Sequence, residues 1–401
     1  MPNGTGAAAG RRGGPSPRVA LTTDWLNSFG GAERVLAELL AVWPGAPVYT
    51  SVHDRAGLPP ECRAWDVRPS FLQRLPGARR RHRALLPLMP FAFEAFDVSG
   101  YDVVLTTATA CAKGVVAPPD TRTVCYCHTP PRYLWDQYHE LTRGARAKPL
   151  VALAAHWLRL WDRAAADRID LFVANSETTA ARIRRYYRRE PVLVYPPVDT
   201  RRFVPREGPA GDYYLCVARL VPNKRIDLAV AAAGRLGRPL VVVGEGPERV
   251  RLERAAGPTV RFVGWQDDAE LAALYAGCRA FLFPGLDDFG IAPVEAQAAG
   301  RPVVAYGYGG ATETVVGGVT GAFFRDSTVE ALVDAMQALD GYEVEPAACR
   351  RNAERFDAAV FRRRMREVVA EVTRPGRAPG APADPPPAPD GVAGPGATAR
   401  W

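Results

Sequence analysis

The chain has 401 residues, 47% of them hydrophobic, which is enough for two domains with cores of ordinary size. Its formal net charge is +8, and it has no run of 18 apolar residues, so we expect no membrane-spanning helix. The amino-terminal stretch has no apolar core, so we expect no secretory signal and a cytoplasmic protein. The seven cysteines are scattered, and only Cys125 and Cys127 are close together, which favours alternating strand residues over a zinc site.

The first predicted elements are a tail, a strand, a glycine loop and a helix. Residues 1–17 are rich in Gly, Ala, Pro and Arg and are expected to be disordered. Residues 18–24 predict a strand, Gly30 and Gly31 a loop, and residues 32–42 a helix. This layout brings the backbone close to a phosphate at the edge of a parallel sheet, although tight turns also use glycine for conformational reasons alone.

Arginines in the first half form two patches, from Arg68 to Arg83 and from Arg182 to Arg189. Two interpretations stay open, namely a solvated basic face and a surface that attracts an anionic membrane or a phosphate-bearing acceptor. The apolar residues that follow the first patch up to Phe96 belong either to a core or to a membrane interface. The aromatic spacing and glycine loops of RNA-binding modules are missing, so we expect no nucleic-acid partner.

His128 ends another predicted strand. Residues 123–128 have strand character, and Pro130 and Pro131 prevent the strand from continuing. A side chain at the carboxyl end of such a strand points toward the ligand cleft of an α/β sheet, so His128 is a candidate site residue. Other strands of the first half are predicted at 47–52, 102–107, 171–176 and 191–198, and residues 206–212 are a predicted linker.

In the second half a pair of cations follows the first strand. Residues 213–219 predict that strand, Arg219 ends it, and Lys224 lies five positions further on, before a helix at 226–236. Both cations can therefore approach one anion, and a departing nucleoside diphosphate develops the charge that such a pair would match. The glycines near 244–246 lack the complete pattern of a dinucleotide site.

The most informative stretch follows an apolar strand at 280–283. Asp287 lies in the loop after that strand, and Glu295 lies in a predicted helix at 293–299 that Gly300 ends. Both carboxylates can then face one pocket at the carboxyl end of the strand, where they would accept hydrogen bonds from sugar hydroxyls.

The backbone of Phe289, Gly290 and Ile291 opens this helix. Its free N–H groups favour anions, phosphate above all. N–H groups that can bind phosphate, next to carboxylates that can accept from sugar hydroxyls, together indicate a nucleotide-sugar site. Further along, Ser327–Glu330 predicts a capping box at a helix start, residues 355–372 predict the last helix, and the Pro/Gly/Ala-rich residues 375–401 are expected to be a disordered tail.

The stretch from Asp287 to Glu295 resembles the signature of retaining GT-B glycosyltransferases of family 4, in which two Glu residues have this spacing and Phe-Gly follows the first. Asp287 stands in place of the first Glu, one methylene shorter. The segment from His128 to Trp135 is similar to the His-Thr-Pro-x-Arg-Tyr-x-Trp stretch of family 4 mannosyltransferases. The resemblance covers about residues 18–372.

This resemblance implies an α/β protein of the GT-B fold, with two facing Rossmann-like domains and the active site in the cleft between them. It implies an acceptor-side domain at 18–205, a nucleotide-sugar-binding domain at 206–354 and a helix at 355–374 that crosses back to the first domain. The donor-binding residues that it implies are Gly30, Gly31, Arg219, Lys224, Asp287, Phe289, Gly290, Ile291 and Glu295.

The same resemblance implies roles for these groups. Arg219 and Lys224 would stabilise the departing diphosphate, Glu295 would hold the ribose hydroxyls, and Asp287 and His128 would grip the transferred hexose. The candidate catalytic residues are His128, Asp287, Arg219 and Lys224, whereas Arg132, Tyr133 and Trp135 would line the acceptor side. No nucleophile is assigned, and no metal or other cofactor is expected.

We therefore predict retaining transfer of a hexose, mannose from GDP-mannose, to a hydroxyl of a glycan or lipid-linked acceptor. A UDP-hexose donor is the nearest competitor. Two rivals from other classes are a nucleotide-sugar epimerase, which needs no acceptor, and a non-catalytic nucleotide-sugar-binding protein, which the replacement at Asp287 keeps open. Peripheral contact with the inner face of an anionic membrane is predicted for the Arg68–Arg83 region.

Overall fold

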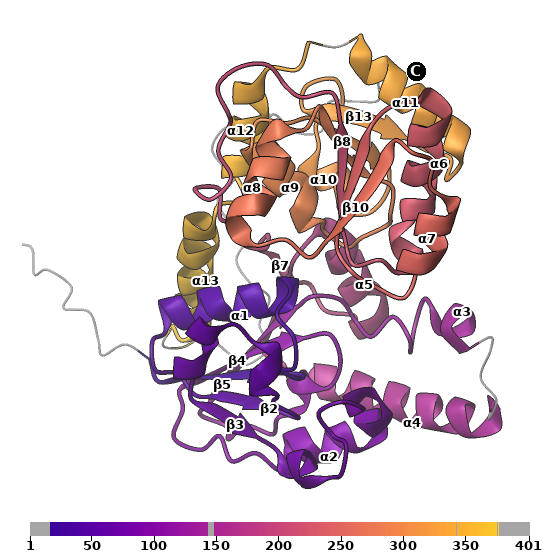
Figure 1. Cartoon of the computed structure of the whole chain (residues 1–401). Helices are drawn as coiled ribbons and strands as arrows, with labels where there is room; N and C mark the ends of the chain where they lie inside the picture. The colour runs from indigo at the N-terminus through magenta and orange to yellow at the C-terminus, as the bar shows by residue number, and fades with distance from the viewer. Residues whose placement is uncertain (1–16, 143–147, 342, 375, 377–401) are drawn as a thin grey trace, which may run out of the picture.

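The structure is a computed structural model that describes residues 17–142, 148–341, 343–374 and 376. The two predicted tails, 1–17 and 375–401, therefore lie almost entirely outside the described residues. Two domains, each built on a twisted parallel sheet flanked by helices, lie one above the other (Figure 1). This arrangement confirms the predicted α/β class with two Rossmann-like domains.

The N-terminal domain contains a seven-stranded parallel sheet in the order β3-β2-β1-β4-β5-β6-β7. Its strands are almost continuously buried, as expected for a sheet with both faces covered. The order reverses between β1 and β4, and ligands of such sheets bind at this switch point. The strands are β1 (Val19–Thr23), β2 (Val48–Thr50), β3 (Val67–Pro69), β4 (Val103–Ala108), β5 (Arg122–Cys127), β6 (Leu171–Ala174) and β7 (Val192–Leu193).

The C-terminal domain contains a six-stranded parallel sheet in the order β10-β9-β8-β11-β12-β13. Here the order reverses between β8 and β11. The strands are β8 (Tyr214–Val217), β9 (Leu240–Val243), β10 (Val260–Gly264), β11 (Ala280–Phe283), β12 (Val303–Tyr306) and β13 (Gly321–Phe324).

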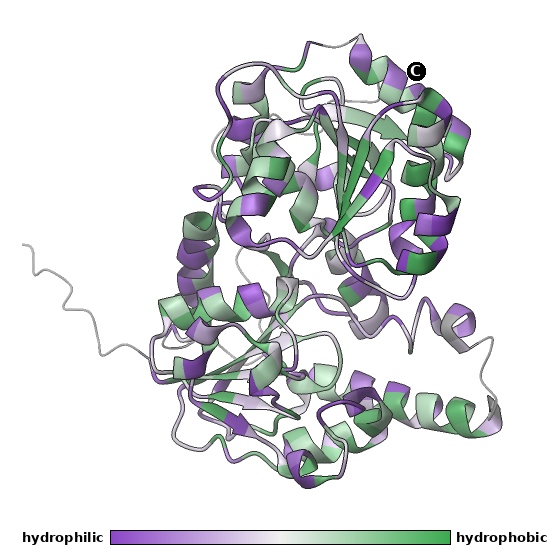
Figure 2. Ribbon diagram, in the orientation of Figure 1, coloured by the Kyte–Doolittle hydropathy of each residue, from purple (hydrophilic) through white to green (hydrophobic). Residues whose placement is uncertain are grey.

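Helices cover the sheets with their apolar sides, so that green strands lie inside and purple residues gather on the outer helix faces (Figure 2). The helices are α1 (Gly31–Val42), α2 (Met89–Glu94), α3 (Tyr138–Thr142), α4 (Lys148–Asp167), α5 (Glu177–Tyr187), α6 (Ile226–Leu236), α7 (Arg249–Ala255), α8 (Asp268–Gly277), α9 (Ile291–Ala298), α10 (Ala311–Thr314), α11 (Val329–Asp340), α12 (Pro346–Glu354) and α13 (Ala358–Val372).

The starts of α11 and α13 differ from the prediction by one and three residues. Helix α11 is capped by Thr328, whose hydroxyl accepts from the Ala331 N–H, while Ser327 accepts from Arg225 instead, so the predicted capping box at Ser327 is not formed. The last helix starts at Ala358 rather than 355, because Asp357 caps it. At α11 two neighbouring residues compete for the capping position, whereas residue 355 ends the preceding helix α12 as its C-cap.

The chain crosses between the domains twice, and the two crossings pair with each other. Val198 donates to the Phe356 carbonyl at 2.9 Å, and Ala358 donates to the Val198 carbonyl at 3.0 Å. After the second crossing α13 lies against α1 (Figure 1), where Arg362 pairs with Glu38 at 2.6 Å. The apolar face of α13 thus belongs to the core of the N-terminal domain.

Candidate active site

The loops after β8 and β11 meet at the switch point of the C-terminal sheet. Lys224, in the loop after β8, contacts the carboxylate of Asp287, in the loop after β11. Arg219, which also follows β8, is exposed, and its side chain has no hydrogen bond or ion pair among the described residues. The structure therefore brings Lys224 and Asp287 together, and it places Arg219 at the carboxyl end of β8, the strand that pairs with β11.

Gly310, at the start of α10, packs closely against the loop after β11. The Gly310 N–H donates to the Asp287 carbonyl at 2.9 Å, and a Cβ on Gly310 would lie only 2.2 Å from Phe289 Cα. The Phe289 ring is buried between Tyr195 and Phe356. The predicted donor-site role of Phe289 therefore rests on its backbone N–H alone, because its ring is not available to a ligand.

We expect Gly310→Ala to weaken donor binding and to destabilise the fold by about 1–3 kcal/mol, because backbone atoms, unlike side-chain ends, cannot move aside for the new methyl group. Thermal unfolding and nucleotide titration measure the two effects. Gly257→Ala is the matched control, since a Cβ there meets nothing within 4 Å. Equal behaviour of the two variants would contradict this account of the loop.

Helix α9 begins at the cleft between the domains. Gly290 precedes it in the left-handed region, at φ 87°, and no side chain caps its first N–H groups. Across the cleft, a Cβ on Gly31 would lie 3.1 Å from Ile291 Cδ1. The glycine loop of the N-terminal domain and the start of α9 therefore face each other closely, and these unused N–H groups suit a phosphate.

Glu295 lies buried one turn into α9 and is held from both domains. Arg34 of α1 donates to one of its carboxylate oxygens at 2.7 Å, and the Tyr275 hydroxyl donates to the other at 2.9 Å. Burial and the neighbouring carboxylate raise the pKa of Tyr275 well above its usual range, which keeps this hydroxyl a donor. Each carboxylate oxygen retains a lone pair, so Glu295 can still accept from a ligand hydroxyl.

Further charged contacts join the domains around the same loop. Arg182 of α5 contacts Asp288, which follows Asp287, and its Nε donates to Asp136 at 3.1 Å. Glu313 of α10 accepts from the Glu177 N–H, at the start of α5, at 2.8 Å. The sequence reasoning missed these residues and Arg34. Only Arg34 had a usable signal, because it lies one turn after Gly30 and must share the cleft face of α1.

His128 follows β5 and faces the same region with an unpaired nitrogen. Its backbone N–H donates to the Ala108 carbonyl at 2.9 Å, and its carbonyl accepts from Thr179 at 3.1 Å. Its buried Nε2 has no hydrogen-bond partner among the described residues. Burial lowers the pKa of His128 to about 4, so the ring is neutral at pH 7. A buried unpaired nitrogen of this kind suits a ligand hydroxyl.

The lowered pKa of His128 predicts a pH dependence of stability. The unfolded chain binds this proton below about pH 6.5 and the folded chain only near pH 4, so stability should fall as the pH drops through that window. Because the side chain is partly exposed, we expect His128→Gln to recover only about 1 kcal/mol of this loss at pH 5. Urea unfolding at pH 7 and pH 5 tests this, with the exposed His139→Gln as control. Equal pH slopes for wild type and His128→Gln would count against it.

The predicted acceptor-side residues lie beside α4. Trp135 stacks on Tyr186 with ring centroids 4.8 Å apart, and its Nε1 donates to the buried Asp162 at 2.9 Å. Asp162 also pairs with the buried Lys113, which fixes the position of the indole. A pocket of about 360 Å³ opens here, lined by Leu134, Trp135, Tyr138, His139, Arg159 and Tyr186. Arg132 contributes to the Asp136 and Asp288 pairs instead, at 3.6 and 3.9 Å.

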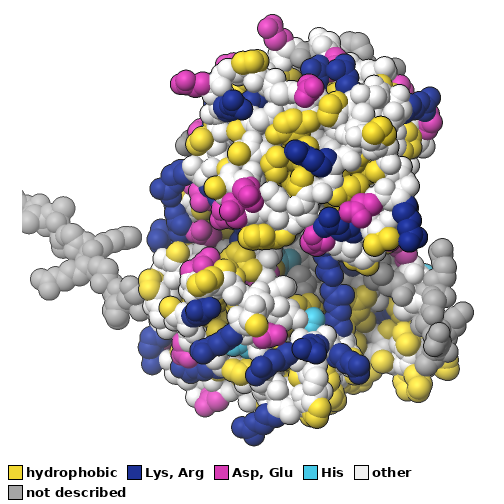
Figure 3. Space-filling model, in the orientation of Figure 1, with side chains coloured by type: hydrophobic (Ala, Val, Ile, Leu, Met, Phe, Trp, Pro, Cys, Tyr) yellow, Lys and Arg dark blue, Asp and Glu magenta, His cyan; other side chains and the backbone are white. Residues whose placement is uncertain are grey.

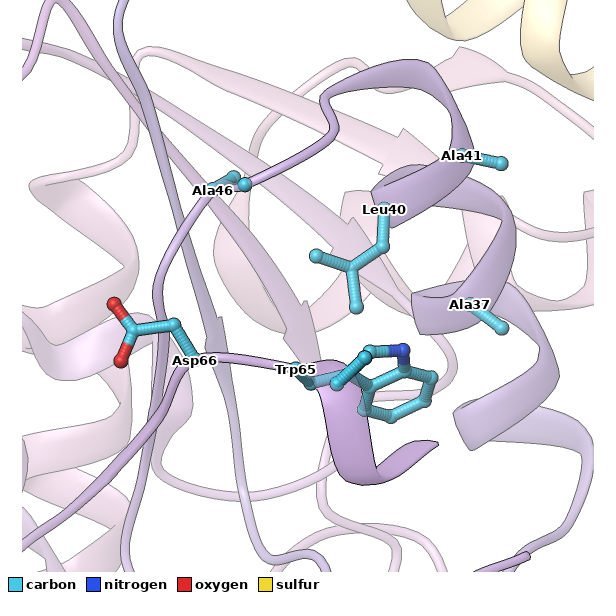
Figure 4. Close-up of a pocket in the computed structure, with 8 residues that line it drawn as sticks. Ala37, Leu40, Ala41, Ala46, Trp65 and Asp66 are labelled. Carbon is cyan, nitrogen blue, oxygen red and sulfur yellow. The ribbon is translucent and has the colours of Figure 1, made fainter. Parts of the chain in front are cut away.

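A second pocket is unrelated to the cleft. It measures about 240 Å³ and lies beside the C-terminal half of α1, where Leu40 and Trp65 line it (Figure 4). Arg34 and Gly31, which face the cleft, lie at the other end of this helix. None of the predicted site residues lines this pocket.

No group of three or more His, Cys, Asp or Glu side chains gathers closely enough to hold a metal ion within the described ranges. No helix in the part of the chain that the structure describes has the length and apolarity needed to cross a bilayer.

Sequence comparison finds two domains and several relatives. Residues 29–202 match the family described as Glycosyltransferase Family 4, and residues 198–356 match Glycosyl transferases group 1. Glycogen synthase of Mycobacterium tuberculosis is 37% identical over 170 residues, which is 39% of each chain. A D-inositol 3-phosphate glycosyltransferase of Mycobacterium leprae is 30% identical over 207 residues, which is 45% of this chain and 48% of that one. The chain thus spans less than half the length of these two relatives.

A longer alignment and the solved structures agree on the architecture. The GDP-mannose-dependent alpha-(1-6)-phosphatidylinositol monomannoside mannosyltransferase of Mycobacterium tuberculosis is 29% identical over 67% of this chain and 83% of its own. Sucrose-phosphate synthase of Thermosynechococcus elongatus shares the fold with a TM-score of 0.67 at 22% identity, over 88% of this chain and 98% of that one. Anabaena Alr3699/HepE, solved with UDP and glucose, gives a TM-score of 0.66 at 18% identity, over 88% and 99%. The first matched region falls in the domain with the seven-stranded sheet, and the second falls in the domain with the six-stranded sheet. The chain belongs to the GT-B glycosyltransferases with family 4 and group 1 domains.

Proposed function

We propose that the protein is a retaining, metal-independent glycosyltransferase that moves mannose from GDP-mannose to a hydroxyl of a glycan or lipid-linked acceptor. One observation carries this proposal. Arg219, Lys224 and the uncapped start of α9 surround the switch point of the C-terminal sheet, together with Asp287 and Glu295, and Gly31 faces them from the other domain. A nucleoside diphosphate bonded to a sugar has the anionic and hydroxyl groups that match these donors and acceptors.

In this proposal the cations and the α9 amides bind the diphosphate. Arg219 and Lys224 neutralise the charge that develops as the glycosidic bond to the phosphate breaks, and the N–H groups at Gly290 and Ile291 share it. Glu295 accepts from the ribose hydroxyls. These groups act most strongly in the transition state, because the leaving diphosphate carries more charge there than in the bound donor.

The other groups hold the sugar. Asp287 accepts from hexose hydroxyls, and the neutral His128 offers Nε2 to another hydroxyl near the reacting carbon. No enzyme nucleophile is needed if the acceptor hydroxyl attacks from the face that the diphosphate leaves, with a donor phosphate oxygen taking the proton. The acceptor then approaches from the side of Tyr133 and Trp135 in the N-terminal domain.

The choice of GDP-mannose is supported by the segment from His128 to Trp135 and by the name of the mannosyltransferase that is similar over two thirds of this chain. A UDP-hexose donor is the alternative. The test is a calorimetric titration of the protein with GDP, UDP, GDP-mannose and UDP-glucose. Tighter binding of the guanine nucleotides supports the proposal. Tighter binding of the uracil nucleotides would leave the assignment of the nucleotide-sugar site unchanged but would contradict GDP-mannose as the donor.

Incubation with the preferred donor then separates the rival functions. Conversion of the donor sugar without acceptor would indicate an epimerase. Donor binding with neither transfer nor hydrolysis would indicate a non-catalytic binding protein, and recovery of activity in Asp287→Glu would trace that loss to the shorter acid. An NMR measurement of the product's anomeric configuration decides between retention and inversion.

A further inference from the structure

Helix α4 carries an apolar stripe on its outer face. Leu150, Leu153, Trp157 and Leu160 follow one another at helical spacing, and Leu150, Leu153 and Leu160 are 68%, 67% and 61% exposed. The inner face of the same helix is already packed against the domain through buried residues such as Leu158. An ordinary surface helix presents polar residues to water, so this second apolar face lacks a partner among the described residues.

The stripe continues onto the neighbouring segment. Phe91 of α2 is 53% exposed and stacks on Trp157 with ring centroids 5.7 Å apart, and Leu88 beside it is also exposed. The two elements are fixed to each other, because Trp161 of α4 donates to Glu94 of α2 at 2.8 Å. The other half of this segment belongs to the core, where Met89 and Phe93 are buried. The apolar residues of the 85–96 stretch are therefore divided between the core and the exposed surface.

A basic cluster adjoins the apolar stripe. Residues 67–93 contain six arginines and neither Asp nor Glu. Five of these arginines, at positions 74, 79, 80, 81 and 83, are exposed and form no ion pair with any described residue. Figure 3 shows dark-blue side chains along the front of the lower domain and yellow ones toward its right-hand side, over α4. A stripe of apolar side chains beside unpaired cations matches the boundary between anionic headgroups and acyl chains.

We propose that the apolar stripe of α4, with Leu88 and Phe91, inserts into the interfacial layer of an anionic lipid bilayer while the arginines at 74–83 contact its headgroups. The positive charge of the arginine cluster favours an anionic bilayer over a second copy of the chain as the partner of this surface. A two-fold dimer on this face would bring two unpaired arginine clusters together, and their repulsion opposes it. A neutral bilayer would satisfy the stripe but leave the arginines without counter-charges.

Docking through α4 also orients the candidate acceptor pocket. Arg159 lies on the neighbouring face of the same helix and lines that pocket, with its guanidinium over the Tyr138 ring at 5.1 Å. A docked α4 therefore holds the pocket beside the headgroups, where the hydroxyls of a lipid-linked acceptor would lie. Membrane binding itself does not require the sugar donor, so it can be tested independently of the proposed transfer reaction.

The test is flotation of the full chain with two kinds of vesicle, phosphatidylcholine alone and phosphatidylcholine mixed with phosphatidylglycerol. We expect binding to the mixed vesicles only, weakened by salt. Reversal of Arg79, Arg80 and Arg81 to Glu should reduce the partition coefficient roughly a hundredfold. The same charge change at the exposed Arg206, Arg254 and Arg261 of the other half is the matched control and should have a much smaller effect.

A second variant tests the apolar stripe. Leu150→Gln, Leu153→Gln and Leu160→Gln together should reduce partitioning at least roughly tenfold, whereas Val204→Gln, Val250→Gln and Val319→Gln, at similarly exposed positions, should not. All variants should keep the wild-type melting temperature, since the changed side chains are exposed. Unchanged binding of either test variant overturns the proposal, and so does a concentration-dependent dimer in light scattering that the Leu→Gln variant abolishes.

Discussion

Lys224→Ala is expected to reduce the rate of sugar transfer roughly a hundred- to a thousandfold and to weaken the binding of any nucleoside diphosphate. The ammonium of Lys224 is the cation closest to Asp287, so its loss removes a counter-charge for the diphosphate. It also leaves the Asp287 carboxylate unpaired in the loop, where it repels the incoming anion. The two effects act in the same direction, which makes this the most damaging single truncation that we predict at the site.

Steady-state kinetics with the preferred donor and calorimetry with the nucleoside diphosphate measure this loss. Arg235→Ala is the control, because it removes an exposed cation that pairs with Glu330 at 2.6 Å, away from the loops of the switch point. A Lys224→Ala variant with wild-type nucleotide affinity would show that the diphosphate binds elsewhere. Restored affinity in Lys224→Ala/Asp287→Asn would assign part of the effect to the unpaired acid.

Glu295→Ala should weaken nucleotide binding roughly a hundredfold without affecting the binding of inorganic pyrophosphate. The proposed role of Glu295 is to accept from ribose hydroxyls, and hydrogen bonds to a charged acceptor contribute about 1.5–3 kcal/mol each. Pyrophosphate has no ribose, so its affinity reports only on Arg219, Lys224 and the α9 amides. Lys224→Ala should instead weaken the binding of both the nucleotide and pyrophosphate.

The structural cost of Glu295→Ala has to be separated from this effect. Removal of one partner from a buried ion pair costs up to about 3–5 kcal/mol, but Arg34 is partly exposed and can turn to water, so we expect a loss of about 1–2 kcal/mol of stability. Arg34→Ala breaks the same pair and keeps the carboxylate. If it weakens nucleotide binding as much as Glu295→Ala does, the contact between the domains, rather than a bond to ribose, explains the result.

The sequence predicted the sheets, the loops and most of the residues that meet in the cleft, because these follow from local patterns. Strands, glycine turns and helix starts show in short windows, and residues at the carboxyl ends of parallel strands must share one edge of a sheet. Arg219 and Asp287 could therefore be assigned to one site although they are far apart in the chain. The buried Phe289 ring could not be predicted, because nothing in its own segment indicates Tyr195 and Phe356 as neighbours.

The contacts between the two domains could not be predicted from the sequence. The pairing of Arg34 with Glu295 and of Arg182 with Asp288 depends on how the two domains are placed, which no local pattern encodes. Arginine is common throughout this chain, so an arginine that bonds an acid of the other domain looks the same in sequence as one that faces water. Similarly, the exposed stripe on α4 has the spacing of a core face, and only the fold shows that it points outward.

The position of α13 has a consequence for synthesis on the ribosome. This helix contributes Phe361, Met365 and Val368 to the core of the N-terminal domain, although it is the last helix that the structure describes. The first domain to leave the ribosome therefore cannot complete its core until residue 372 has emerged, whereas the second domain has all its strands by residue 324. The N-terminal domain therefore stays incomplete during synthesis of the second domain, with the apolar surface of α1 that α13 covers still exposed. The C-terminal domain can complete its fold first. A nonsense mutation just before residue 358 would leave the residues of the diphosphate site intact and still yield a protein prone to aggregation.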